Sequence, residues 1–186
     1  MPPKIRITRE EIVRAATELV RREGANALNA RSVAAELGCS TQPIFSNYGT
    51  MEELKAAVIV SAESVYRDYA GEETARGEYP PYKAGGMAYI RFAAEETELF
   101  RLLFMRDRSG ETIPEETELG ADMEALVRGN TGLDGDTAKL FHLEMWAFVH
   151  GIAVIIATDY LKLDRELVSR MLTDCYTGLR KAYGRE

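Results

Sequence analysis

The chain has 186 residues, of which 46% are hydrophobic and 28% are charged, with 15 glycines and 6 prolines. This composition excludes a disordered or collagen-like polypeptide and is typical of one or two folded domains. The net charge is −7, but residues 1–55 carry eight of the 23 basic and seven of the 30 acidic side chains. The acidity therefore belongs to the C-terminal part, and the N-terminal part is not excluded from binding nucleic acid.

Nothing in the sequence predicts a membrane span, an exported protein or a metal site. The most apolar stretch, residues 145–158, contains His150 and falls short of the roughly 20 apolar residues that a span needs. The N-terminus lacks the apolar segment of a secretory signal, so we expect a cytoplasmic protein. Cys39 and Cys175 form no Cys-x-x-Cys motif, and His142 and His150 lack the Glu-x-x-His spacing of a carboxylate-bridged site. We therefore expect no bound metal or cofactor.

The first predicted helix has a clear beginning and end. Thr8 and Glu11 have the spacing of a capping box, in which each side chain accepts a hydrogen bond from the other residue's backbone. An apolar stripe at helical spacing follows, and Gly24 is a suitable stop. The pattern predicts a helix over residues 9–23.

Two short helices are expected next. Asn29 can cap a helix over residues 31–37, and Ser40 can cap another over residues 41–48. Pro43 fits the second of these because the first turn of a helix leaves its amides without intrahelical partners.

The rest of the chain also has a helical pattern. Thr50 opens a second capping box and a longer helix that fades near Gly71, and residues 71–81 are rich in glycine and proline, as in a linker. Asp136 and Asp164 are the expected caps of the last two helices. No period of two runs through the sequence, so the predicted class is all-α. The C-terminal helices are expected over residues 82–96, 98–105, 114–128, 136–159 and 164–183.

The two short helices, separated by a turn that contains Gly38, have the form of a helix-turn-helix. A helix of about eight residues fits the major groove, where polar side chains read base edges. Ile44 and Phe45 are expected to face the other helices. The residues expected to face DNA are Thr41, Gln42, Ser46 and Asn47.

Residues 28–40, with Phe45, Tyr48 and the Glu-Glu-Leu sequence at 52–54, closely resemble the tetracycline-repressor family. Further on, Trp146-x-x-x-His150-Gly151 looks like the family's Trp-His-Gly subtype. The resemblance implies a helix-turn-helix DNA-binding domain, here 1–50, and a helical ligand-binding and dimerisation domain, here 51–186, with helix 51–70 connecting them. It also implies a homodimer that leaves its operator when an effector binds.

The sequence departs from the family's pattern at its basic residues. Many members carry lysine before Glu-Glu-Leu to meet a DNA phosphate, whereas this chain has Met51, and residues 41–48 contain no lysine or arginine. Phosphate contacts are expected instead from basic residues nearby and from helix N-termini, with Arg9 as a further candidate. The expected DNA-binding set is Lys4, Arg6, Arg31, Ser40, Thr41, Gln42, Pro43, Ser46, Asn47, Tyr48 and Lys55.

An apolar cluster in the C-terminal part is either core or the lining of an effector site. The resemblance favours a site for a largely apolar or aromatic molecule, whereas helical spacing alone favours core. The last two helices have apolar stripes wider than one chain's core requires, which predicts a homodimer through them. The expected ligand-binding residues are Phe92, Phe100, Phe104, Phe141, Met145, Trp146 and His150.

Two other functions are open to an all-α chain. An adaptor could bind protein through its C-terminal helices without touching DNA. An enzyme is the less favoured reading, because the sequence has no glycine-rich phosphate loop and no nucleophile arrangement. The expected function is a ligand-responsive, DNA-binding transcriptional regulator, most simply a repressor.

Overall fold

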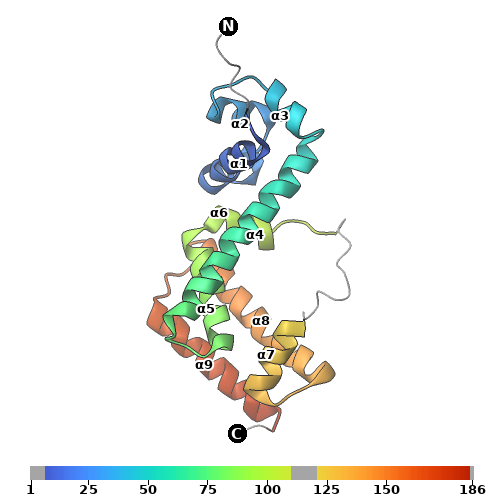
Figure 1. Ribbon diagram of the computed structural model, residues 1–186. Helices are drawn as coiled ribbons and strands as arrows, with labels where there is room; N and C mark the ends of the chain where they lie inside the picture. Colours follow the sequence, from blue (N-terminus) through green and yellow to red (C-terminus); the bar gives the residue numbers. More distant parts are fainter. Residues whose placement is uncertain (1–6, 110–120, 185–186) are drawn as a thin grey trace. The chain divides into compact units, whose positions relative to one another are not determined.

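The structure is a computed structural model that describes residues 7–109 and 121–184. Over these residues the chain forms nine α-helices and a short 3-10 turn and contains no strand, which confirms the all-α class (Figure 1). The helices are α1 (Arg9–Glu23), α2 (Ala30–Glu36), α3 (Gln42–Asn47), α4 (Met51–Arg76), α5 (Pro81–Glu95), α6 (Thr97–Phe104), α7 (Ala121–Thr131), α8 (Gly135–Ala157) and α9 (Arg165–Ala182).

The chain divides into two compact units. The first unit consists of residues 1–67 together with 96–106, and the second of residues 68–95 together with 107–186. Helix α4 therefore contributes its first part to one unit and its last part to the other, and α6 belongs to the unit that contains α1 to α3.

Three of the four predicted caps in the first unit are confirmed, although the box at Thr50 forms only one of its two bonds. Thr50 accepts from the amide of Glu53 at 3.2 Å, and the Glu53 carboxylate accepts from the amide of Gly49. Thr8 and Glu11 form both bonds of the capping box, and Asn29 accepts hydrogen bonds from the amides of Arg31 and Ser32, the second and third residues of α2. The prediction that Ser40 caps α3 is wrong. Thr41 is the N-cap residue and makes no side-chain bond, because its own backbone is already helical instead of extended.

The first unit packs α1 against α2 and α6. The last turn of α1 is held by Arg21, whose Nε donates to Glu96 at 2.7 Å. Gly24 has a φ of +82°, a conformation that favours glycine. The large side chains at the centre of this unit are Ile12, Leu19, Val20, Val33, Ile44, Tyr48, Leu54, Val58, Leu99 and Phe100.

Helix α4 does not fade at Gly71 as predicted but continues to Arg76, which leaves only residues 77–80 before α5. A glycine inside a helix costs only about 1 kcal/mol. The helical turn after Gly71 contains Glu73, whose side chain is fully buried in the second unit and stabilises that turn. Tertiary contacts there outweigh the weak local preference.

Glu73 lies at the centre of a cluster of arginines from three helices of the second unit. Its carboxylate contacts Arg165 of α9 at 2.5 Å, Arg91 of α5 at 3.2 Å and Arg76 of α4 at 3.4 Å. Glu72, which is exposed, pairs with Arg91 as well. A buried carboxylate requires such partners, since an unpaired charge away from water is costly.

The remaining helices of the second unit surround α5, which contacts α7, α8 and α9. Gly86 of α5 faces both α8 and α9, and a Cβ added there would lie 3.3 Å from Leu172 and 3.4 Å from Val149. A separate buried cluster joins α7 to α8 and receives aromatic rings from α5 and α9. It consists of Val127, Leu133, Ala138, Phe141 and Met145, with Tyr82, Tyr176 and Tyr183 packed against it.

The ends of the last three helices differ in part from the prediction. The helix expected over 114–128 is α7, which runs from Ala121 to Thr131, and residues 114–120 lie outside the described residues. Asp136 is not the cap of α8, because the extended residue before the helix is Asp134; Asp136 lies in the first turn. Asp164 caps α9 as predicted by accepting from the amide of Leu167 at 2.8 Å.

Helix α8 is long and apolar enough to cross a membrane by length and composition, with a mean hydropathy of 1.7 over 18 residues. Such a helix is weak evidence for a membrane span, because the core helix of a globular protein passes the same test. A third of the window is buried in this chain, where α8 packs against α5, α7 and α9. Leu140 and Leu143 of α8 remain 49% and 57% exposed.

Candidate nucleic-acid interface

A tight turn places α3 after α2. The backbone amide of Gly38 donates to Ala35 at 3.1 Å, and that of Cys39 donates to Ala34 at 2.9 Å. Gly38 adopts a φ of +62°, a conformation that glycine reaches without strain. The two helices and this turn form the helix-turn-helix arrangement that the sequence predicts.

Helix α3 has one buried side and one exposed side. Ile44 is 1% exposed and faces the core as predicted, and Gln42 and Ser46 are exposed. Phe45 is 50% exposed, so the prediction that it faces the other helices is wrong. Its position three residues after Gln42 and one before Ser46 places it on the outer side, and this spacing was the signal that could have identified it.

The side chain of Asn47 is bound to the chain's own backbone. Its Nδ2 donates to the carbonyl of Pro43 at 2.8 Å and to that of Ile7 at 3.4 Å. Both amide hydrogens are thus engaged, whereas bidentate contact with adenine requires a free donor beside the oxygen. Asn47 therefore joins the last turn of α3 to the backbone of the same unit, and Gln42 is the side-chain amide that remains on the outer side.

Arg9 of α1 binds the C-terminal end of α3. Its Nη1 donates to the carbonyl of Asn47 at 2.6 Å, and its guanidinium lies 4.1 Å from the centre of the Tyr48 ring. Tyr48 is 2% exposed, and its hydroxyl donates to the carbonyl of Arg9 at 3.3 Å. Arg9 and Tyr48 together set the position of the reading helix from its inner side.

The remaining expected DNA residues lie at the helix ends or outside the described residues. Arg31, in the first turn of α2, and Lys55, on α4, are exposed. Met51, the first residue of α4, is half-buried. Lys4 and Arg6 lie outside the described residues. Ser40 is exposed, and Thr41 and Pro43 are half-buried at the beginning of α3.

An ion pair joins α1 to α2 on the surface of this unit. Arg22 donates through both terminal nitrogens to Glu36, at 3.2 and 2.9 Å. These hydrogen bonds raise the pKa of Arg22 and lower the pKa of Glu36. Both groups are fully charged at neutral pH, and their pairing keeps Arg22 from being a free phosphate ligand.

The residues expected to bind an effector fall into both units. In the first unit, the rings of Phe100 and Phe104 lie 5.3 Å apart, and Tyr66 packs edge-on against Phe104. In the second unit, Phe92 and Phe141 are fully buried, and Met145 is 6% exposed. Phe92, Phe100 and Phe141 thus serve the core of the single chain.

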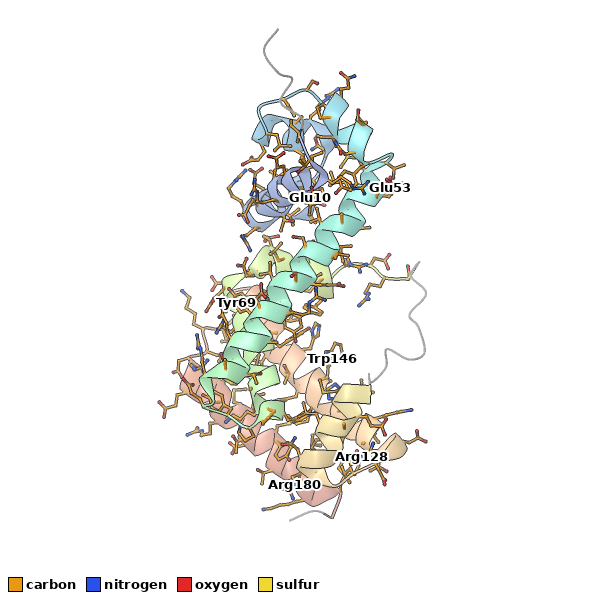
Figure 2. All side chains as sticks on the ribbon, viewed as in Figure 1. Glu10, Glu53, Tyr69, Arg128, Trp146 and Arg180 are labelled. Atoms are coloured by element: carbon orange, nitrogen blue, oxygen red, sulfur yellow. The ribbon has the colours of Figure 1, made fainter. Side chains whose placement is uncertain are left out.

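In the second unit, Trp146 and His150 are the expected effector-binding residues that reach the surface. Trp146, which is labelled in Figure 2, is 42% exposed on α8. Its ring stacks on that of His150 with centroids 4.9 Å apart. A hydrogen bond of 2.9 Å joins His150 Nδ1 to the hydroxyl of Tyr89. Burial lowers the pKa of His150, so its ring is neutral at pH 7. The trio combines aromatic surface with a polar group.

Comparisons with known proteins agree with this architecture. Residues 82–175 match the family model described as "Tetracyclin repressor-like, C-terminal domain". The chain is 28% identical over 162 residues to an uncharacterized HTH-type transcriptional regulator of Mycobacterium tuberculosis. The aligned region covers 84% of this chain and 73% of that protein.

Two solved structures have the same fold. A TetR-like transcriptional regulator from Rhodococcus sp. RHA1 superposes with a TM-score of 0.69 at 15% identity over 100% of both chains. A TetR family member from Streptomyces coelicolor A3 superposes with a TM-score of 0.63 at 20% identity, over 90% of this chain and 96% of that one.

Proposed function

We propose, on the premise that this chain belongs to the tetracyclin repressor-like family, that it is a repressor released from its operator by a small molecule. The chain is a ligand-responsive, DNA-binding transcriptional regulator. The observation that carries the proposal is the outer side of α3, where Gln42, Phe45 and Ser46 stand clear of the core. The same proposal assigns the chain to the Trp-His-Gly subtype and to the cytoplasm.

DNA contact is divided between reading and anchoring residues. Gln42 can bond an adenine edge, and Phe45 offers an apolar surface to a thymine methyl group. Arg31, Lys55, Lys4 and Arg6 supply the cations for phosphates, helped by the amides at the beginning of α3 and α4. Ser40, Thr41, Pro43 and Ser46 lie around the same helix. Because Asn47 and Tyr48 are bound within the unit, their part in DNA binding is to hold α3 in place.

The operator is proposed to be a pseudo-palindrome with A·T pairs under Gln42. Gln42→Ala should weaken binding to a selected operator by about 1 to 3 kcal/mol and relax the preference at one base pair of each half-site. Fluorescence anisotropy with single-base operator variants measures both effects.

Asn47→Ala is the matched comparison, because it removes the same chemical group from the same helix. It should lower the melting temperature and weaken binding to all sequences alike, since its amide bonds the backbone of Pro43 and Ile7 and so holds α3 in place. A relaxed base preference in Asn47→Ala, with none in Gln42→Ala, would exchange the roles of the two residues. Absence of any mobility shift with genomic fragments would favour the adaptor function instead.

The regulator is proposed to be a homodimer through α8 and α9. Leu140 and Leu143 project from α8 with substantial exposure in the single chain, and exposed apolar surface of this kind marks interaction sites. Two-fold symmetry would place the two reading helices about one DNA turn, roughly 34 to 36 Å, apart.

The effector is proposed to be a largely apolar or aromatic small molecule held near Trp146 and His150. Trp146 is the only tryptophan, so its emission reports directly on this place. An aromatic effector should quench that emission saturably and raise the melting temperature. At a concentration one hundred times its dissociation constant, it should add about 2.7 kcal/mol to the free energy of unfolding.

Trp146→Phe separates the two readouts of effector binding. It removes the emission but keeps an aromatic ring, so the rise in melting temperature should remain. A hydrophobic library that neither quenches Trp146 nor stabilises the protein would contradict a site there.

A further inference from the structure

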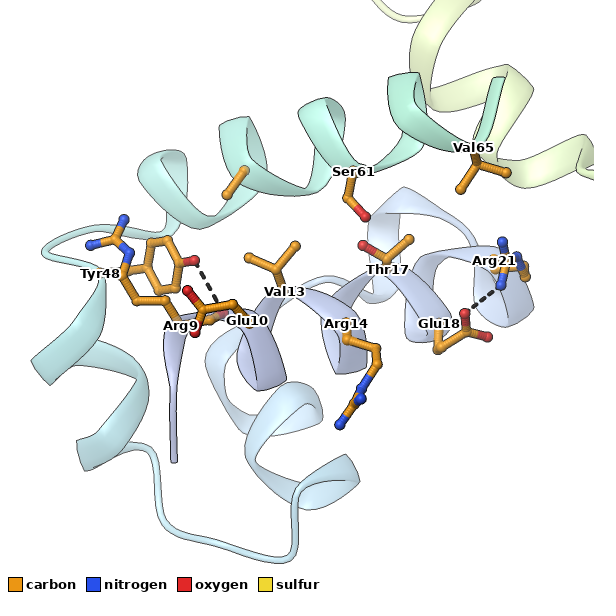
Figure 3. Close-up of a pocket in the computed structure, with 11 residues that line it drawn as sticks. Arg9, Glu10, Val13, Arg14, Thr17, Glu18, Arg21, Tyr48, Ser61 and Val65 are labelled. Atoms are coloured by element: carbon orange, nitrogen blue, oxygen red, sulfur yellow. Dashed lines mark hydrogen bonds and ion pairs between the residues drawn. The ribbon is translucent and has the colours of Figure 1, made fainter. Parts of the chain in front are cut away.

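A cleft of about 520 Å³ lies between α1 and the first part of α4, entirely within the first unit (Figure 3). We call it the α1–α4 cleft. Its walls include Val13 of α1 and Ala57 and Val65 of α4, and it extends at one end to Tyr48. Small-molecule sites in proteins commonly have volumes of roughly 300 to 1,000 Å³. The cleft is therefore large enough for an organic ligand and contains none of the residues of the proposed effector site.

Two hydroxyl groups are placed between the apolar walls. Thr17 points from α1 and Ser61 from α4, each toward the other across the cleft (Figure 3). Apolar walls with a small number of polar groups are the usual composition of a ligand site, where the polar groups fix the ligand's orientation.

Thr17 makes the cleft more than a packing gap. Its side chain is only 4% exposed, and among the residues that the structure describes its Oγ1 has no hydrogen-bond partner. A buried hydroxyl without a partner opposes folding, and valine has nearly the same shape without that disadvantage. A ligand oxygen at this point would supply the missing hydrogen bond.

The charged residues around the cleft are directed elsewhere. Arg21 is paired with Glu18 and Glu96, and Arg9 is held by the carbonyl of Asn47 and the ring of Tyr48. Glu10 and Arg14 are exposed, and Arg14 extends away from α4 (Figure 3). Charged side chains line part of the cleft, but Arg9, Glu18 and Arg21 already have partners within the unit. The hydroxyls of Thr17 and Ser61 are the neutral polar groups that remain for an uncharged ligand.

We propose that the α1–α4 cleft is a second small-molecule site, which takes an uncharged, mostly apolar molecule whose carbonyl or hydroxyl oxygen bonds Thr17 and Ser61. This site goes beyond the proposed function, because it lies in the DNA-binding unit and not among the effector residues. Arg9 and Tyr48, which hold α3, form one end of the cleft. A bound molecule therefore contacts the residues that support the reading helix.

Prodan, an uncharged aromatic ketone whose emission shifts to the blue in apolar surroundings, is a suitable probe. Titrated into the full-length protein without DNA, it should give a saturable blue-shifted signal. Thr17→Val should raise its dissociation constant at least about tenfold, which corresponds to the loss of one buried hydrogen bond, without lowering the melting temperature. Ser61→Leu, which fills the cleft, should abolish the signal from the cleft.

Prodan also belongs to the chemical class proposed for the effector site, so the titration is repeated in Trp146→Ala, in which the component of the signal that depends on Thr17 should remain. Three results would overturn the proposal: no saturable signal, equal affinity in wild type and Thr17→Val, or loss of that component in Trp146→Ala. Because Thr17→Val conserves the volume of the side chain, its result tests the proposal even if Ser61→Leu does not fold. The titration contains no DNA, so its outcome is independent of whether the operator proposal holds.

Discussion

Glu73→Ala should lower the free energy of unfolding by about 3 to 5 kcal/mol, the cost of breaking a buried ion pair by removing one partner. The carboxylate is fully buried and contacts Arg76, Arg91 and Arg165 from three helices. Its loss removes the buried counter-charge and leaves Arg91 and Arg165 with the exposed carboxylates of Glu72, Glu95 and Glu78. Thermal and urea unfolding, followed by circular dichroism, measure the change.

Glu72→Ala is the matched control for this prediction, because Glu72 is the adjacent residue and also pairs with Arg91. Its side chain is 60% exposed, and exposed ion pairs contribute at most about 1 kcal/mol. Glu73→Gln should fall between the two variants, since it keeps hydrogen bonding but not charge. Equal destabilisation by Glu72→Ala and Glu73→Ala would show that burial of the carboxylate is not what matters.

Leu143→Glu should convert the proposed dimer to a monomer at micromolar concentration. Leu143 lies on the exposed side of α8, and a carboxylate placed in an apolar contact loses its hydration without gaining a partner. The substitution acts twice in a two-fold interface. We expect the dissociation constant of the dimer to rise by at least about a hundredfold, since each 1.4 kcal/mol is a factor of ten. Sedimentation velocity measures the constant, and operator affinity should fall with it.

Ala125→Glu adds the same charge at an exposed position of α7. It should leave both the dimer and operator affinity unchanged. A stable dimer in Leu143→Glu, with normal operator affinity, would place the interface on another surface of the chain.

Local signals in the sequence predicted the features that local interactions determine. The capping box at Thr8, the cap at Asn29 and the cap at Asp164 are all confirmed. Each consists of a side chain and an amide two or three residues further on, so nothing outside the segment is needed to form it. The buried position of Ile44 followed equally from spacing along one helix.

The features that the sequence did not predict depend on residues far away in the chain. Helix α4 passes Gly71 because Glu73 meets arginines at positions 91 and 165, and the sequence does not reveal that pairing. Asn47 is engaged partly by the carbonyl of Ile7, forty residues earlier. The α1–α4 cleft combines residues of two helices that are far apart in the sequence with Tyr48 at the end of a third, and no pattern within one segment indicates that they line a common space.

The six residues of α3 are too few to form a stable helix alone. Ile44, Asn47 and Tyr48 anchor it, with Arg9 holding it from α1. The outward positions 42 and 45 take no part in that anchoring. Regulators that share this scaffold can therefore diverge in the promoters they control by exchanging two side chains, and reprogramming this one calls for mutagenesis at positions 42 and 45 with the anchors left intact.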